Sequence, residues 1–289
     1  MLDLHLCLIC IGDEMMVTDN VDRDKLMLYD ADMKIYYDDV VEALYSANVQ
    51  QGDIIFVHSD VSVFGKLGNV RDKDKFLGMI LNAFKEAVGS EGTIIMPTFT
   101  YSFTKGETYC PETSPSTVGV LTEFFRKQIG VTRTIHPIFS AAVWGKEKAY
   151  FTEGLSKDSF DDDSIFGKLR KKKGKLVFFG VDFHAMTFLH HIEQKHVVPY
   201  RYMKSFTGRI KVGDKEYEDT YTYYVRYLDK NVVTDASRFE RYALECGALK
   251  EVKLGYSAVK VARSNDIFDV GYELLDKDIF FFLKDKVMI

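Results

Sequence analysis

Cysteine is rare in this sequence, and the cysteines that are present lack the spacing of a structural metal site. Four occur in 289 residues: Cys7, Cys10, Cys110 and Cys246. They do not form a C-x2-C…C-x2-C pattern, so we expect reduced thiols and no structural zinc. Reduced thiols are typical of the cytoplasm, which is the location that we expect.

Long apolar runs are also missing, and we expect no membrane-spanning helix. None approaches the ~20 apolar residues that a bilayer requires. The opening segment, residues 1–12, is apolar but has no basic n-region and no clear cleavage site, so it is a poor signal peptide. Because Met15 and Met16 follow closely, a start assigned too far upstream is an open alternative for residues 1–15.

Positive charge is not in excess either. The chain has 38 Lys and Arg against 43 Asp and Glu, a formal net charge of −5. Affinity for nucleic acid comes largely from clustered cations, so we expect no nucleic-acid partner. The one dense basic run, residues 170–173, is expected to lie on a solvated helix end.

Apolar residues are plentiful, and segments with helical spacing alternate along the chain with short apolar runs typical of buried strands. They make up 46% of the chain, enough for one large core or two modest ones. Helices are predicted at residues 37–49, 72–88, 116–128 and 164–170, and buried strands at 54–57, 93–96, 140–144 and 176–181. Alternating strands and helices indicate α/β layering. We therefore expect a tail over residues 1–36 and a single domain over residues 37–289.

Beyond Pro199 the pattern becomes richer in strands. Residues 209–217 predict a hairpin around Gly213 and Asp214, and residues 220–227 alternate like a half-exposed strand. Residues 252–261 predict one more strand, and helices are expected at 236–246 and 264–275. The C-terminal part is thus predicted to be a β-rich elaboration.

Polar residues follow two of the predicted strands. His58, Ser59 and Ser62 come after strand 54–57, and Thr98 and Thr100 come after strand 93–96. In open α/β sheets, ligands bind at the carboxyl ends of strands, which makes both clusters candidate binding residues. The alternative is that they cap turns and satisfy loop backbone groups.

Two more segments could hold a ligand. The first, Ser116 to Gly119 with Thr117 and Val118, is predicted to open a helix whose free N–H groups could bind a phosphate or amide oxygen, unless Ser116 is an ordinary N-cap. The second segment contains Arg133, whose positive charge could pair with a phosphate, and His136, whose imidazole could line the same cleft. Either residue could instead be structural.

The strand at 176–181 is followed by a segment with three histidines. His190 and Glu193 are three residues apart, so on a helix they share a face and could act as base and partner. The alternative is a pair of satisfied, partly buried histidines. With His191 and His196 they match neither H-E-x-x-H nor H-x-x-E-H, so a metal site is not expected. Cys110 as a covalent nucleophile has no flanking signature.

In their order along the chain, these clusters resemble the aminoglycoside 3-N-acetyltransferases and their sugar-acylating relatives. The resemblance spans most of residues 37–283, and its segments are V-H-S-D (57–60), E-G-T-I-I-M-P-T-F-T (91–100), S-P-S-T-V-G (114–119), R-T-I-H-P (133–137) and T-F-L-H-H-I-E (187–193). In that family the histidine of the L-H-x-x-E element is the proposed catalytic base. It falls on His190.

The resemblance implies an α/β/α sandwich around a mixed central sheet, with acetyl-CoA or another acyl-CoA as co-substrate and no metal. It places His58, Ser59 and Ser116–Gly119 along the pantetheine arm, and Thr98 and Thr100 at the thioester as low-ranked oxyanion donors. The carboxylate partner of His190 is left open among Glu193, Glu218 and Asp219. Oligomeric state is also left open.

The acceptor is expected to be an amine on a sugar. The departures from the family pattern, with Tyr101 after Thr100, favour a nucleotide-linked amino sugar, which Tyr200 and Arg201 would hold by stacking and by pairing with a pyrophosphate. The main alternative is aminoglycoside acetylation, as in antibiotic resistance. An acyl-CoA-binding protein without turnover and a metal hydrolase are ranked lower.

Overall fold

A mixed sheet forms the centre of the molecule. The structure is a computed structural model that describes residues 23, 25–30 and 33–288. Seven strands pair in the order β11-β12-β8-β3-β5-β7-β6. Their bounds are β3 (Ile54–Ser59), β5 (Thr93–Pro97), β6 (Thr132–Arg133), β7 (Ala141–Gly145), β8 (Lys175–Phe179), β11 (Leu249–Leu254) and β12 (Ser257–Arg263). β3 is parallel to β5 and β8, and the other pairs are antiparallel.

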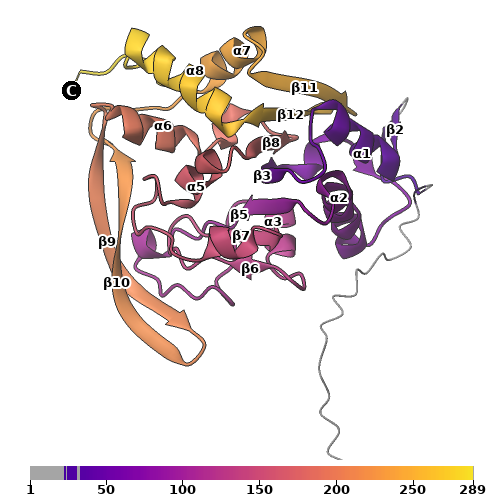
Figure 1. Cartoon of the computed structure of the whole chain (residues 1–289), viewed down its shortest axis with the longest axis horizontal. Helices are drawn as coiled ribbons and strands as arrows, with labels where there is room; N and C mark the ends of the chain where they lie inside the picture. Colours follow the sequence, from indigo (N-terminus) through magenta and orange to yellow (C-terminus); the bar gives the residue numbers. More distant parts are fainter. Residues whose placement is uncertain (1–22, 24, 31–32, 289) are drawn as a thin grey trace, which may run out of the picture.

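Helices cover both faces of this sheet, as Figure 1 shows. One apolar core lies under α1 (Tyr37–Ser46), α2 (Lys73–Val88) and α3 (Val120–Phe125), and the other under α4 (Lys148–Thr152), α5 (Ile165–Lys171), α6 (Leu189–His196), α7 (Ser237–Glu245) and α8 (Ser264–Lys277). Successive strand residues point to opposite faces, so Ile55 and Val57 belong to the first core and Phe56 to the second. The predicted α/β/α sandwich is confirmed.

Helix α2 illustrates how the local sequence builds one of these layers. Its apolar residues recur at helical spacing, and Phe76, Ile80 and Phe84 are buried. Asp72 accepts a hydrogen bond from Lys75 N at 2.8 Å and caps the start of the helix. Gly89 ends it with φ of 65°, a conformation that glycine adopts without a Cβ penalty. Burial of each large apolar side chain contributes about 1.5–3 kcal/mol.

The C-terminal part adds a long two-stranded ribbon that extends from the helical layer (Figure 1). It consists of β9 (Arg201–Val212) and β10 (Lys215–Arg226), which are antiparallel and paired along their whole length. The predicted hairpin around Gly213 is thus confirmed, but it is longer than the sequence pattern indicated. Four residues separate the end of α6 from the start of β9, so the start of this strand lies close to that helix.

Two predicted elements were wrong. Residues 252–261 form parts of two strands, β11 and β12, because Gly255 makes a turn there with φ of 59°. Residues 116–128 contain only the short helix α3, which begins at Val120 after Gly119 with φ of 134°. The expected helix start at Ser116 is therefore not present.

The predicted tail is partly folded. β1 (Leu28–Asp30), β2 (Met33–Ile35) and β4 (Lys66–Leu67) form a small antiparallel sheet. Leu28 and Ile35 are buried in the first core, so this part of residues 1–36 belongs to the domain. Residues 1–15, for which an upstream start was considered, lie outside the described residues.

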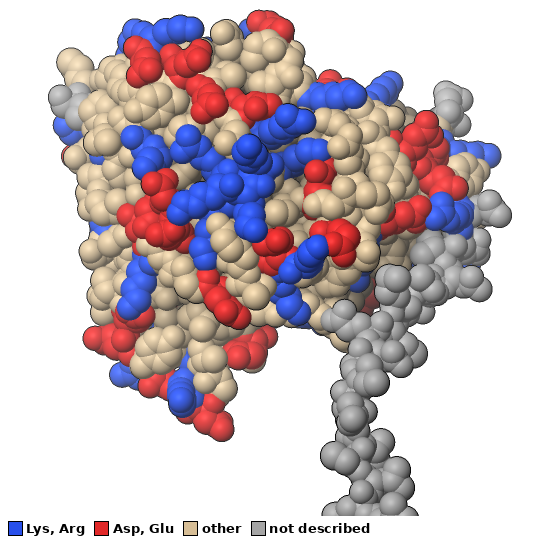
Figure 2. Space-filling view, in the orientation of Figure 1, with Lys and Arg blue, Asp and Glu red and all other residues tan. Residues whose placement is uncertain are grey.

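The basic run lies at the end of α5. On the face of the molecule that Figure 2 shows, Lys and Arg side chains gather near the centre with Asp and Glu around them. Lys171 Nζ lies 2.7 Å from Asp163 Oδ1, and Lys172 Nζ lies 2.8 Å from Glu147 Oε2. The predicted solvated helix end is confirmed, and acidic neighbours offset its charge. In the described part of the chain, no helix has the length and apolarity that crossing a membrane requires.

Candidate active site

His190 and Glu193 lie on one face of α6, as their spacing predicts. His190 Nδ1 is 2.6 Å from Glu193 Oε2. The Glu193 side chain is fully buried, whereas that of His190 is 20% exposed. In the neutral ring, Nδ1 carries the hydrogen and donates it to the carboxylate, so Nε2 keeps its lone pair. Of the carboxylates considered as partner, Glu193 is therefore the one in contact with His190.

Arg201 completes a buried group of charges around Glu193. Its Nε lies 2.8 Å from Glu193 Oε2, and both side chains are almost wholly buried. The remaining guanidinium nitrogens donate to the Tyr224 carbonyl and the Thr234 hydroxyl, each at 3.3 Å. The turn after α6 brings Arg201 here, because Val197 adopts a left-handed conformation with φ of 59°.

The ionisation of this group follows from burial and from the arginine charge. Burial and the Arg201 charge lower the pKa of His190, and the contact with Glu193 only partly opposes them. Burial by itself would raise the pKa of Glu193, but Arg201 and His190 outweigh it and the pKa is lowered. The resting pair is thus a neutral imidazole beside a carboxylate, the state that a general base requires.

The Phe160 ring packs against the imidazole. The Phe160 ring meets the His190 ring edge-on, with centroids 5.2 Å apart, and it also contacts the Tyr223 ring at 5.8 Å. No hydrogen bond joins His190 Nε2 to another residue in the described range. Nε2 is therefore the atom of this group that is available to a reactant.

A pocket of about 570 Å³ opens at the carboxyl ends of the three parallel strands. Six of its lining residues are among those expected from the sequence to bind a ligand, namely His58, Ser59, Ser62, Tyr101, Val118 and Gly119. The pocket extends to Thr187, which precedes α6 and whose carbonyl accepts a hydrogen bond from His190 N at 3.0 Å. The position agrees with the rule that ligands bind beyond the carboxyl ends of strands.

Two buried polar atoms in this pocket have no hydrogen-bond partner in the described structure. They are His58 Nε2 and Ser59 Oγ. Burial lowers the pKa of His58 to about 3, so its ring is neutral. An unpaired buried polar group is costly, so both atoms are fitted to pair with polar groups of a ligand.

Other residues that were predicted to bind a ligand are buried inside the protein and do not line this pocket. Thr100 Oγ1 donates to the Pro137 carbonyl at 2.9 Å, and Thr98 Oγ1 accepts from Arg133 Nε at 3.0 Å. Arg133 is also buried and donates to the Thr98, Pro111 and Ser114 carbonyls. These contacts hold the loops together, so the expected hydroxyl donors and phosphate-binding cation are occupied by the protein itself.

Ser116, Thr117 and His136 are likewise engaged in internal contacts. Ser116 N donates to Glu123 Oε2 at 2.7 Å, and Thr117 Oγ1 donates to the Phe99 carbonyl at 3.0 Å. His136 Nδ1 accepts from Phe139 N at 3.0 Å, and burial lowers its pKa to about 3. None of the three lines the pocket.

The remaining candidate catalytic residues do not contact His190. Asp219 lies on β10 and pairs with Lys157 Nζ at 2.6 Å, and Glu218 beside it is exposed. Cys110 Sγ donates to Glu112 Oε2 at 3.0 Å. Among the described residues, no group of three or more His, Cys, Asp and Glu side chains is placed to hold a metal ion.

Sequence reasoning missed several residues near the site. Val181, His184 and Ala185 line the pocket from the segment after β8, where the strand-end rule could have found them. Phe160 contacts the His190 ring, and Tyr223 contacts Phe160. Neither carries a local signal, because they come from a loop and from a strand that are distant in sequence.

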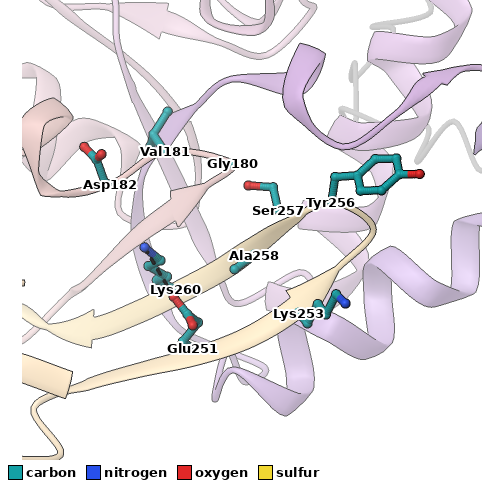
Figure 3. Close-up of a pocket in the computed structure, with 9 residues that line it drawn as sticks. All are labelled: Gly180, Val181, Asp182, Glu251, Lys253, Tyr256, Ser257, Ala258 and Lys260. Atoms are coloured by element: carbon teal, nitrogen blue, oxygen red, sulfur yellow. Dashed lines mark ion pairs between the residues drawn. The ribbon is translucent and has the colours of Figure 1, made fainter. Parts of the chain in front are cut away.

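A second pocket, of about 480 Å³, adjoins the first at Val181, which lines both. Figure 3 shows it between the end of β8 and the β11–β12 hairpin. Lys260 Nζ lies 3.3 Å from Glu251 Oε2 and also pairs with Glu240. The Lys260 charge is therefore offset by two carboxylates.

Comparison with known proteins shows which family this chain matches. The family model for aminoglycoside 3-N-acetyltransferase matches residues 56–276. Aminoglycoside N(3)-acetyltransferase IV from Salmonella sp. is 26% identical over 248 residues, which cover 85% of this chain and 89% of that protein. Two solved structures share the fold. The apoenzyme of aminoglycoside acetyltransferase AAC(3)-IVa has a TM-score of 0.70 at 24% identity, over 86% of this chain and 91% of that chain.

The second is AAC-IIIb in its binary complex with CoASH, with a TM-score of 0.71 at 20% identity, over 86% of this chain and 98% of that chain. The family match covers well over half of the sequence. It includes the pocket residues from His58 onward and the His190–Glu193 pair. This chain belongs to the aminoglycoside 3-N-acetyltransferase family.

Proposed function

We propose that this protein transfers an acetyl group from acetyl-CoA to an amine of an aminoglycoside, with His190 as the general base. The observation that carries the proposal is the contact of 2.6 Å between His190 Nδ1 and Glu193 Oε2, which leaves Nε2 without a protein partner. Family membership supports the N-acetyltransferase activity, and the names of the relatives support the acceptor.

The reaction requires that the amine lose a proton as it attacks. The amine nitrogen bonds to the thioester carbonyl carbon, and His190 Nε2 takes a proton from that nitrogen. Glu193 stabilises the imidazolium that forms. The C–S bond then breaks, and the proton passes from His190 to the leaving thiolate. The products are the amide and CoA with a free thiol, with His190 neutral again.

The pocket at the strand ends is the proposed binding site of the acyl-CoA co-substrate. Its apolar side chains include Phe99, Val118 and Leu121, which suit the methylene groups of a pantetheine arm. The unpaired polar atoms of His58 and Ser59 suit its amides or the thioester oxygen. They replace Thr98 and Thr100, whose hydroxyls contact the protein.

The residues once expected to bind a nucleotide do not support that acceptor. Arg201 is buried against Glu193, and the Tyr200 ring is fully buried. Neither side chain is exposed to stack on a base or to pair with a pyrophosphate. The expectation of a nucleotide-linked amino sugar is therefore withdrawn in favour of the alternative acceptor.

The test is to measure thiol release from acetyl-CoA with a panel of aminoglycosides. His190→Gln is expected to lower kcat by about 10²–10⁴-fold, the usual contribution of a general base, without loss of the fold. His196→Gln is the matched control, because it lies on the same helix but pairs with Asp276 at 2.9 Å. Undiminished transfer by a folded His190→Gln variant would overturn the mechanism.

A further inference from the structure

Glu193 has two carboxylate oxygens, and the contacts with His190 and Arg201 use only one of them. Oε2 lies 2.6 Å from His190 Nδ1 and 2.8 Å from Arg201 Nε. Oε1 is buried and forms no well-aligned hydrogen bond with the described residues. Because a buried acceptor without a donor costs free energy, we expect a donor for Oε1 nearby.

The Tyr200 hydroxyl is a second buried polar atom that forms no well-aligned hydrogen bond with the described residues. Its ring is fully buried, with its centroid 6.0 Å from that of the Phe280 ring. Burial raises the pKa of Tyr200, and the nearby Glu193 carboxylate raises it further. The hydroxyl therefore stays protonated, and it lies close to a carboxylate that lacks a donor on one oxygen.

The turn after α6 explains why Tyr200 and Arg201 both reach Glu193. Val197 adopts a left-handed conformation with φ of 59°, and Val198 N donates back to the Glu193 carbonyl at 3.2 Å. The chain therefore reverses beside the residue whose side chain it contacts. Two consecutive residues of the returning segment then bring a hydroxyl and a guanidinium to the same carboxylate.

Two further tyrosines near Glu193 do not provide the missing donor. Burial raises the pKa values of Tyr223 and Tyr224 on β10, and the Glu193 charge contributes to both shifts. The Tyr224 hydroxyl donates to the Val198 carbonyl at 2.7 Å. Tyr223 forms no hydrogen bond with Glu193 in the described structure, and its ring contacts Phe160. Tyr200 is therefore the tyrosine whose hydroxyl is free to pair with Oε1.

Charged side chains in the pocket and on the segments around α6 have other partners. The pairs are Asp60 with Ser62, Asp158 with Gln194, Asp162 with Lys195, Asp276 with His196, and Arg226 with the Val232 carbonyl. None of these charged groups contacts Glu193 or His190 in the part of the chain that the structure describes. Protonation of the His190–Glu193 pair therefore depends mainly on burial, on Arg201 and on the donors that the carboxylate receives.

We infer that Tyr200 is a positioning residue for the proposed general base: its hydroxyl donates to Glu193 Oε1 and so holds Oε2 toward His190 Nδ1. The last torsion of a glutamate side chain is broad, so a small rotation of the carboxylate aligns this hydrogen bond. Without the hydroxyl, the carboxylate turns more freely. The inference rests on the proposed function and deepens it. Tyr200 lines neither pocket, so it acts through Glu193 and touches no reactant.

The test is Tyr200→Phe, which keeps the ring and removes the hydroxyl. Glu193 then loses a donor that shares its charge, so it stabilises the imidazolium more strongly and the acid limb of kcat/KM moves to higher pH. The movement should be smaller than on removal of the Arg201 charge, because the hydroxyl is neutral. At the plateau, kcat should fall about 2- to 10-fold, the usual effect of one hydrogen bond, with unchanged KM values.

Tyr109→Phe is the matched control, because Tyr109 is equally buried but its hydroxyl donates to the Thr134 carbonyl at 2.7 Å, away from Glu193. It should leave the acid limb and kcat unchanged. A second control places Tyr200→Phe in a Glu193→Gln background. There it should lower kcat no further, because the hydroxyl acts through the carboxylate.

A folded Tyr200→Phe variant with the wild-type acid limb and kcat, or an equal change in Tyr109→Phe, would overturn the inference. Absence of transfer to every amine would instead refute the proposed function. NMR titration of the His190 ring, which needs no turnover, then tests Tyr200 by itself. The midpoint should lie at higher pH in Tyr200→Phe than in the wild type, and equal midpoints would count against the role of Tyr200.

Discussion

Arg201 Nε and His190 Nδ1 meet at the same atom, Oε2 of Glu193, at 2.8 and 2.6 Å. The carboxylate therefore serves two partners at once. Arg201 keeps it ionised inside the protein, and Glu193 in turn orients the imidazole. Because the arginine charge also lowers the pKa of His190, this arrangement favours the neutral imidazole that the proposed role as general base requires.

Replacement of Arg201 should change the pH dependence of the reaction. The acid limb of kcat/KM reports protonation of the coupled His190–Glu193 pair. In Arg201→Gln the nearby positive charge is lost, so the pKa of His190 rises and the acid limb moves to higher pH. Arg201→Lys, which keeps the charge, should shift it less.

The same variant should lose stability, because a buried carboxylate without its cation costs about 3–5 kcal/mol. Urea unfolding of Arg201→Gln and Arg201→Lys measures this loss. An acid limb at the wild-type position in a folded Arg201→Gln protein would contradict the assigned role of Arg201.

Mild acid should destabilise the fold through buried histidines. Burial lowers the pKa of His58 and His136 to about 3 and that of His191 to about 4. In the unfolded chain these groups have pKa values of about 6.5. The unfolded state therefore binds more protons below pH 6.5, and stability present above that pH is lost as pH falls towards 4.

Each of the three histidines should contribute about 2 kcal/mol to the loss of unfolding free energy between pH 7 and pH 5. Urea unfolding at the two pH values measures it. His191→Asn keeps a donor to the Phe160 carbonyl, which His191 Nδ1 contacts at 2.6 Å, and should reduce the loss by about 2 kcal/mol. Equal stability at both pH values would contradict burial of neutral rings.

Gly180 should not tolerate a side chain. It follows β8 with φ of 77°, and a Cβ there would lie 2.3 Å from the Asp60 carbonyl oxygen. Gly180→Ala is expected to lose more than about 1 kcal/mol and to weaken acetyl-CoA binding, because Val181 beside it lines the pocket. Gly154→Ala, with φ of 57° and no atom within 4 Å of the added Cβ, isolates the backbone cost alone. Equal losses in the two variants would show that the close approach to Asp60 is relieved without cost.

We expect Arg133 to stabilise the fold and not to bind a phosphate. Its guanidinium donates to three carbonyls, those of Thr98, Pro111 and Ser114. Arg133→Gln should lower the free energy of unfolding by about 1–3 kcal/mol, because the part-buried Pro111 and Ser114 carbonyls lose their donor, whereas the Thr98 carbonyl keeps the Ser140 hydroxyl. Unfolding in urea and the KM for acetyl-CoA are measured together. A rise in that KM with unchanged stability would show instead that the guanidinium meets the co-substrate.

The sequence by itself determined the features that depend on short-range spacing. Helical period predicted α2, and the three-residue separation placed Glu193 beside His190, because residues three apart share a helix face. Strand ends predicted His58 and Ser59 at the pocket. The resemblance in motif order supplied the acyl transfer, which spacing alone could not.

Only the tertiary structure decided which polar groups are free for a ligand. Thr98, Thr100 and Arg133 have the same local signals as binding residues, but packing directs them to each other and to loop carbonyls. Arg201 reaches Glu193 through the turn at Val197, and Tyr223 contacts Phe160 from a distant strand. Such contacts depend on the summed packing of segments far apart in the chain, and no local pattern of residues records them.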